Sequence, residues 1–259
     1  MAPQHRTEKG RRRIYPSRAI ILAAGKGVRM QSELPKVLHP LLGKPLIQHV
    51  IDNIRQSGID DITIVVGYKG DDVMREAGPS VHYAWQREQL GTGHAVLQTE
   101  DRFSGFSGKV LVACGDAPLI SAKSFSSLLQ QMDGQKVKAT VLTMVHENPT
   151  GYGRMIKDEQ GALVRIVEEK DATPEQKLIK EVNSGTYVFD SALLFEGLKT
   201  IKNDNAQKEY YLPDVLGYII GKGFQVTTMP LDDPFEGSGI NSKEELAAIE
   251  KAILDGKSK

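Results

Sequence analysis

The chain has 259 residues, of which 40% are hydrophobic and 25% charged, and its 33 Lys and Arg balance its 33 Asp and Glu. This composition is typical of one globular domain and excludes a disordered chain, while the lack of any run of about 18 apolar residues argues against a membrane-spanning helix. Cys114 is the only cysteine, which excludes an internal disulfide and a zinc site built on several cysteines, and we expect a cytoplasmic protein.

The charge is unevenly distributed along the chain. Met1–Arg18 holds six Lys and Arg against Glu8 alone, a local charge of +5, so the remaining residues sum to −5. We expect residues 1–17 to be a solvated basic tail, with contact to RNA or an anionic surface as the alternative. The tail has no apolar core of the kind a secretory signal needs, and the body lacks the basic excess that nucleic-acid binding requires.

The first half of the chain alternates between predicted strands and helices. Short apolar runs predict buried strands at Ala19–Ala24, Asp61–Gly67, Val81–Trp85, Lys109–Cys114 and Ala139–Val145. Helical spacing of apolar residues predicts helices at Pro45–Ser57, Gly70–Ala77, Thr92–Thr99 and Ser124–Met132. This alternation is typical of a doubly wound α/β sheet.

The pattern changes after Val145. We expect a hairpin of Arg154–Lys157 and Leu163–Glu168, strands at Glu181–Phe189 and Gln225–Pro230, and helices at Ser191–Leu198, Leu212–Ile220 and Ser242–Leu254. These elements predict a mixed α+β lobe laid against the first sheet. The whole of 18–259 is expected to form one domain, with one functional half at about 18–145 and another at about 146–240.

A loop of small residues follows the first predicted strand. Its sequence, Leu22–Met30 (LAAGKGVRM), supplies backbone N–H groups that can surround an anion. Met30 stands where a dinucleotide-binding fingerprint needs its third glycine, and no P-loop motif is present. The cations Arg29 and Lys36 beside this loop favour a polyphosphate site, with an ordinary strand-to-helix turn as the alternative.

The loop, followed by Pro35-Lys36, resembles that of the sugar-nucleotide pyrophosphorylases. Six further motifs extend the resemblance in family order: Gln86–Ala95, Cys114–Leu119, Thr150–Arg154, Val167–Ala172, Val182–Gly185 and Asn205–Tyr211. Over about Ile20 to Glu250, the chain resembles the uridyltransferase domain of the bacterial bifunctional N-acetylglucosamine-1-phosphate uridyltransferase/acetyltransferases. This resemblance implies a Rossmann-like nucleotidyltransferase fold, with a mixed central sheet and a smaller α+β sugar-binding lobe.

The resemblance also implies a reaction: UTP and N-acetylglucosamine 1-phosphate give UDP-N-acetylglucosamine, a precursor for the cell wall, and pyrophosphate. Mg²⁺ is the implied cofactor, with Asp116 and Asn241 as its protein ligands. Asp116 lies just beyond a predicted strand, at the carboxyl edge where open α/β sheets bind ligands. The alternatives are a turn or N-cap role for Asp116 and an N-cap role for Asn241 at the last helix.

The remaining site residues are implied by position within the family motifs. We expect Arg29 to bind the triphosphate and the leaving pyrophosphate, and Lys36 to bind the α-phosphate and the sugar phosphate. The implied nucleotide-binding residues are Leu22, Ala23, Ala24, Gly25, Gln86, Gly91 and Thr92. The implied sugar-binding residues are Cys114, Gly115, Gly153, Glu168 and Asn183. Taken singly, Gln86 is equally well explained as an edge-strand residue and Glu168 as part of a solvated face.

Three features depart from the family pattern. Val28 replaces the usual Ser or Thr of the loop, and Cys114 replaces a common tyrosine. The family's trimerising β-helix with its acetyltransferase site is missing, so we expect uridylyl transfer alone and leave the oligomeric state open. The alternatives are a pyrophosphorylase for another sugar phosphate or nucleotide, and a catalytically silent regulatory subunit that binds sugar nucleotides.

Overall fold

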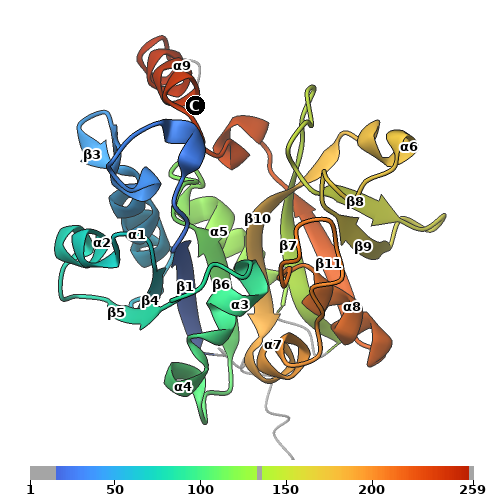
Figure 1. Ribbon diagram of the computed structural model, residues 1–259. Helices are drawn as coiled ribbons and strands as arrows, with labels where there is room; N and C mark the ends of the chain where they lie inside the picture. The colour runs from blue at the N-terminus through green and yellow to red at the C-terminus, as the bar shows by residue number, and fades with distance from the viewer. Residues whose placement is uncertain (1–15, 133–135, 257–259) are drawn as a thin grey trace, which may run out of the picture.

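The computed structural model describes residues 16–132 and 136–256, so nearly all of the predicted basic tail lies outside the described residues. Within those ranges a central sheet runs in the order β11-β7-β10-β6-β1-β4-β5 (Figure 1). Its strands are β1 (Ser17–Ala23), β4 (Ile62–Val66), β5 (His82–Trp85), β6 (Lys109–Cys114), β7 (Val137–Val145), β10 (Glu181–Asp190) and β11 (Gln225–Pro230). Neighbouring strands are parallel except where β10 pairs with β6 and β7.

The predicted fold class, α/β with a mixed central sheet, is confirmed. The strands of the second half do more than lie against the first sheet, because β10 inserts between β6 and β7 and β11 extends the edge beyond β7. The part that projects from the sheet is the hairpin β8 (Arg154–Lys157) and β9 (Leu163–Val167), joined to β10 through β8, together with α6 (Pro174–Lys177). Strand periodicity predicted that the β10 segment is a strand, but it could not predict the position of β10 between β6 and β7. A long-range antiparallel pairing leaves no local signal in the sequence.

Helices cover both faces of the sheet. They are α1 (Leu46–Gln56), α2 (Gly70–Ala77), α3 (Thr92–Leu97), α4 (Glu100–Phe103), α5 (Ala122–Gln130), α7 (Ser191–Leu198) and α8 (Asp214–Gly221), whereas α9 (Lys243–Leu254) packs away from the two sheet cores. The predicted helix Thr92–Thr99 ends early, at Leu97, and the short α4 follows it. Sequence analysis also missed the two-residue strands β2 (Pro40–Leu41) and β3 (Lys44–Pro45), which are too short to carry a periodic signal.

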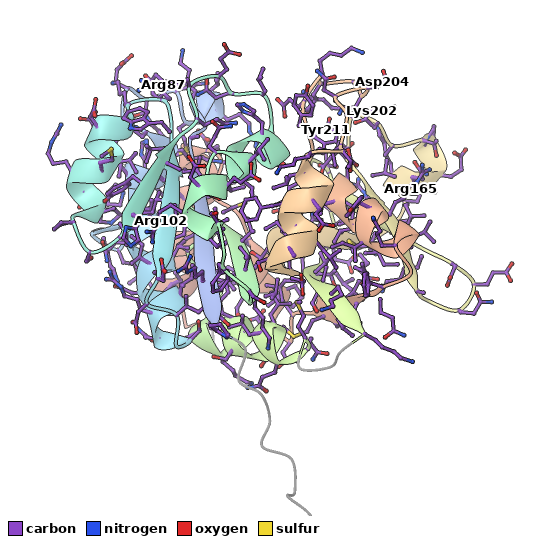
Figure 2. All side chains as sticks on the ribbon, turned by 90° about the horizontal axis from the view of Figure 1, so that it is seen from below. Arg87, Arg102, Arg165, Lys202, Asp204 and Tyr211 are labelled. Atoms are coloured by element: carbon purple, nitrogen blue, oxygen red, sulfur yellow. The ribbon has the colours of Figure 1, made fainter. Side chains whose placement is uncertain are left out.

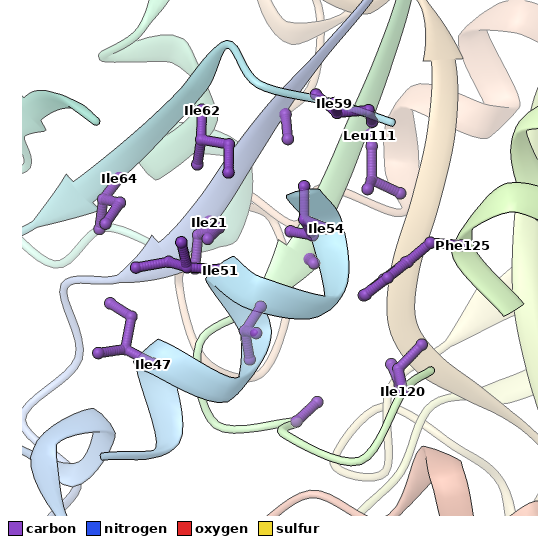
Figure 3. Packing of buried hydrophobic residues seen from close by; sticks show 14 of the residues in the cluster. Ile21, Ile47, Ile51, Ile54, Ile59, Ile62, Ile64, Leu111, Ile120 and Phe125 are labelled. Carbon is purple, nitrogen blue, oxygen red and sulfur yellow. The ribbon is translucent and has the colours of Figure 1, made fainter. Parts of the chain in front are cut away.

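Alternate residues of each central strand point to opposite faces and into different cores. On β1, Ile21 packs with the helices α1, α2 and α5, whereas Ile20 packs with α3, α7 and α8. Figure 3 shows the first core, where Ile51 and Ile54 of α1 meet the sheet and Phe125. Each such buried side chain contributes about 1.5–3 kcal/mol, so the sheet and its loop ends form a rigid support for a site.

A third, smaller cluster fixes the C-terminal segment. Ile249 of α9 packs with Leu41, Leu46 and Ile240, and Figure 1 shows α9 beside the segment that carries β3. This packing holds the chain around Ile240 against Leu41 and Leu46, residues more than 190 positions earlier. Among the helices of the described residues, none is both long and apolar enough to cross a bilayer.

Candidate active site

The glycine loop leaves β1 and packs directly on the cation predicted beside it. Gly27 adopts a left-handed conformation (φ 63°), and a Cβ at this position would lie 2.6 Å from the Cβ of Lys36. A larger residue would therefore displace Lys36. The loop is anchored by Met30, which is 1% exposed and ends a 3-10 turn (Val28–Met30). Lys36 itself begins a second such turn (Lys36–Leu38), held by the buried Val37 and Leu38.

Four side chains from three distant segments of the chain meet beside this loop. The Lys36 ammonium forms an ion pair with Asp116 and donates to Asn241 Oδ1 at 3.0 Å. The guanidinium of Arg29 donates to the same Asn241 oxygen at 2.9 Å. The fold thus brings Asp116 and Asn241, the two predicted metal ligands, to the Lys36 ammonium, and it places Arg29 beside Asn241.

A backbone hydrogen bond accounts for the approach of Asn241 to Asp116. The N–H of Ile240 donates to the carbonyl of Asp116 at 2.9 Å, while the Ile240 side chain is buried in the α9 cluster. The alternative that Asn241 caps the last helix is wrong, because Ser242 is the N-cap and its hydroxyl accepts from the N–H of Glu245. The Asn241 side chain is therefore available to the site.

Two adjoining pockets open at this cluster. The first, which we term the glycine-loop pocket, is lined by all seven predicted nucleotide-binding residues together with Lys36 and Asp116. The second, the bulge pocket, is lined by Arg29, Asp116, Asn241 and four of the predicted sugar-binding residues, Cys114, Gly153, Glu168 and Asn183. Leu22, Thr92, Cys114 and Asp116 line both pockets. Asp116 therefore stands where a ligand in one pocket would meet a ligand in the other.

Gln86, at the end of β5, faces the glycine-loop pocket although it is 4% exposed. Its Nε2 lies 3.0 Å from the carbonyl of Gly91 and 3.1 Å from His94 Nδ1. None of the hydrogen bonds among residues 16–132 and 136–256 uses Gln86 Oε1. His94, which sequence analysis did not assign to the site, thus orients the Gln86 amide. The only sequence feature that pointed to His94 was its place in the Gln86–Ala95 motif, eight positions after Gln86.

Gly91 is required by a close backbone approach. Its φ is 109°, and a Cβ there would lie 2.6 Å from the carbonyl oxygen of Tyr210. The N–H of Gly93 donates to that same carbonyl at 2.8 Å, and Thr92 Oγ1 accepts from the N–H of Leu212 at 3.0 Å. The segment around Tyr210 thus holds the loop that forms one wall of the glycine-loop pocket.

The bulge pocket takes its shape from an irregularity in β10. The pairing of β10 with β7 shifts between Asn183 and Thr186, where Gly185 has φ 77°. Asn183 is 8% exposed; its Nδ2 donates to Tyr187 Oη at 2.6 Å and its Oδ1 accepts from the Gly185 N–H at 3.0 Å. Bulges often redirect side chains at functional sites, and residues 183–185 of this one line the pocket.

Among the ionisable groups that line the bulge pocket, Glu168 has a strongly raised carboxyl pKa. Burial, reinforced by the carboxylates of Asp171 and Asp214, raises its pKa to about 7. These two acids line a separate polar groove behind the pocket, which Glu168 also borders. Figure 2 labels Tyr211 and Lys202 in that groove, on the flank formed by the second half of the chain.

Gly153 and Cys114 contact their neighbours closely. A Cβ on Gly153 would lie 3.1 Å from Glu168 Oε1, so a side chain there would press on that carboxylate. Cys114 Sγ lies 3.5 Å from the carbonyl of Gly185, and burial raises the thiol's pKa to about 12, which makes it a wall residue rather than a nucleophile. Gly115 lines neither pocket; its N–H donates to the carbonyl of Leu22 at 2.9 Å and links β6 to the loop.

Comparison with known proteins decides the family. The model of the nucleotidyl transferase family matches residues 18–233, which is most of the chain. The chain belongs to this family. The matched region contains the glycine loop, Asp116 and the bulge of β10, while Asn241 lies just beyond it.

Among nucleotidyl transferases, the chain is similar to proteins named bifunctional protein GlmU. It is 48% identical to the protein of Oceanobacillus iheyensis, 47% to that of Halalkalibacterium halodurans, each over 235 residues, and 43% to that of Bacillus licheniformis over 232 residues. These alignments cover 90–91% of this chain and 51–52% of the relatives. The chain thus spans about half the length of the curated relatives it matches.

Proposed function

We propose that the chain transfers a uridylyl group from UTP to N-acetylglucosamine 1-phosphate, forming UDP-N-acetylglucosamine and releasing pyrophosphate. The observation that carries this proposal is the position of Asp116, Lys36 and Asn241 at the junction of two pockets. One pocket has the small-residue loop suited to a nucleotide, and the other has the polar groups suited to a sugar. The reaction implied by the sequence resemblance joins two anions at such a junction.

The reaction requires charge neutralisation and alignment rather than a side-chain base. A sugar phosphate is already mostly ionised at neutral pH, so its oxygen can attack the α-phosphorus directly. The new phosphorus–oxygen bond forms as the bond to the β-phosphate breaks, and the electron pair leaves with pyrophosphate. Lys36, between the pockets, would hold the attacking phosphate and the α-phosphate in line, while Arg29 would stabilise the leaving pyrophosphate.

The donor set at the junction fits the implied magnesium ion. Asp116 and Asn241 present a carboxylate and a carboxamide oxygen, which already converge on a single positive charge, the Lys36 ammonium. Mg²⁺ typically takes one or two protein oxygens and completes its coordination with phosphates and water. These two residues would hold it, and the bound ion would supply charge neutralisation to the reacting phosphates.

The pockets also suggest how each substrate is selected. The Gln86 Nε2 is occupied by Gly91 and His94, so its Oε1 is the atom positioned to accept a hydrogen bond from a base. Uracil carries a proton on its ring N3 and cytosine does not, which favours UTP over CTP. In the bulge pocket, Asn183 and the Glu168 carboxylate would bind the sugar. Residues of about 18–145 would therefore serve the nucleotide, and those of about 146–240 the sugar.

The proposal implies small-molecule substrates and a cytoplasmic setting, where nucleoside triphosphates are available and a lone thiol stays reduced. It is tested by measuring pyrophosphate release across a panel of NTPs and sugar 1-phosphates, with and without Mg²⁺. We expect turnover to require Mg²⁺ and to favour UTP with N-acetylglucosamine 1-phosphate. Equal turnover of glucose 1-phosphate would contradict the proposed specificity for the N-acetylated sugar. Absence of turnover with every pair would favour the regulatory alternative.

A further inference from the structure

Arg154 heads the fully buried side chains of the described residues by size and is 1% exposed. It begins β8 directly after Gly153 of the bulge pocket, yet its side chain does not line that pocket. Taking a guanidinium out of water is costly unless it is paired, and even a paired buried charge is seldom more stable than an apolar replacement. Its burial therefore calls for an explanation other than stability.

Most partners of Arg154 are on the segments that form the bulge pocket; the exception is the carbonyl of Lys177 in α6, which accepts from Arg154 Nη2 at 3.4 Å. Its Nη2 forms an ion pair with Glu169 Oε2 at 2.7 Å, and its Nη1 donates to the carbonyl of Tyr152. Glu169 Oε2 also accepts from the N–H of Gly151 at 3.2 Å. The Arg154 Nε finds no hydrogen-bond partner among the described residues, so the guanidinium is held through its two Nη atoms by the Tyr152 carbonyl, Glu169 and the Lys177 carbonyl.

The loop fixed in this way forms one wall of the pocket. Thr150, Gly151, Tyr152 and Gly153 all line it, and the ring of Tyr152 stacks on His146 at 5.6 Å. The carbonyl of Gly153 accepts from the Asn183 N–H at 2.9 Å.

Glu169 is the residue next to Glu168, whose carboxylate would lie 3.1 Å from a Cβ on Gly153. A shift of residues 151–153 would therefore move both predicted sugar-binding groups, Glu168 and Asn183, relative to each other.

We infer that the ion pair between the buried Arg154 and the partly exposed Glu169 positions the sugar-binding wall of the site: it sets the spacing between the loop 151–153, Glu168 and Asn183, and so determines affinity for the sugar without touching it. The inference rests on the proposed function, because it assigns the bulge pocket to the sugar. The pair is expected to act on one pocket only, since residues 150–153, Glu168 and Asn183 line the bulge pocket and none of them lines the glycine-loop pocket.

Binding measured without turnover tests this role. Calorimetric titration gives the dissociation constants of UDP and of UDP-N-acetylglucosamine. The ratio of the UDP constant to the UDP-N-acetylglucosamine constant reports how much affinity the sugar adds. Glu169→Gln removes the charge while keeping the side-chain shape. Arg154→Met/Glu169→Leu removes both charges, so it leaves no unpaired buried ion and keeps the fold. In both variants we expect the ratio to fall about tenfold or more, with UDP affinity unchanged within about twofold.

Glu181→Gln is the matched control. Glu181 pairs with Lys157, on the same strand as Arg154, and neither residue lines the bulge pocket. This variant is expected to keep the wild-type ratio. Thermal unfolding of each variant separates a loss of fold from a loss of positioning. If Glu169→Gln does not fold, the ratio measured in the double variant is the test of the inference.

A wild-type ratio in the folded double variant would overturn the inference, as would an equal loss of UDP and UDP-N-acetylglucosamine binding. A different result addresses the proposed function: wild-type protein that binds UDP-N-acetylglucosamine no more tightly than UDP would overturn that proposal, and the inference with it.

Discussion

Replacing Glu168 by glutamine should stabilise the free protein at high pH while weakening its binding of the sugar. Burial and the nearby carboxylates raise the pKa of Glu168 from its ordinary value of 4.5 to about 7. Between these values the folded state keeps a proton that the unfolded chain has lost. The stability that this proton provides is present at low pH and is lost as pH rises through about 7.

The size of the effect follows from the raised pKa. A pKa increase from 4.5 to about 7 corresponds to about 3 kcal/mol of penalty on the ionised form, of which about 2–3 kcal/mol develops between about pH 5 and pH 8. Glu168→Gln cannot ionise and avoids this loss. For a chain of this size, the variant's Tm at pH 8 should exceed that of the wild type by up to about 10 °C, with a much smaller difference at pH 5.

Urea or thermal unfolding at several pH values measures this difference, with Glu159→Gln as control because Glu159 is exposed in the β8–β9 turn. The same variant should bind the sugar phosphate about 10–100-fold more weakly, because a carboxylate accepts stronger hydrogen bonds than an amide. A Glu168→Gln protein no more stable than wild type at pH 8, or a stability difference that does not grow from pH 5 to 8, would refute the reasoning.

Three further outcomes follow from the site. Asp116→Asn should lower kcat by about 10³-fold or more while leaving the far-UV circular dichroism spectrum unchanged; wild-type turnover at limiting Mg²⁺ would contradict the metal assignment. Gly91→Ala should cost more than about 1 kcal/mol of stability and raise the KM for UTP, because its Cβ would meet the Tyr210 carbonyl; an unchanged Tm and KM would show that the loop can yield. Gln86→Ala should reduce the kcat/KM preference for UTP over CTP by about tenfold, and a preserved preference would remove Gln86 from base selection.

Local signals in the sequence placed most elements closely. The ranges for α2, β6, β8, α7 and β11 match the structure residue for residue, because apolar periodicity, glycines and prolines act within a few positions. The weak points were short or irregular elements. The bulge of β10 at Ser184-Gly185 arises from pairing with β7, about forty residues earlier. The glycine at position 185 is a local signal for a bulge, but it does not say which strand is the partner.

The sequence alone determined which residue types the site has: a loop of small residues, two cations beside it, and an aspartate at the end of a buried strand. Only the tertiary structure decided that Asn241 meets Asp116, because that contact depends on α9 packing onto β2 and α1 and on one backbone bond across 124 positions, from Ile240 to Asp116. The same holds for the pair of pockets and for the pKa of Glu168. Burial and contact between distant segments arise from how the whole chain packs, whereas residue patterns report only on their neighbours.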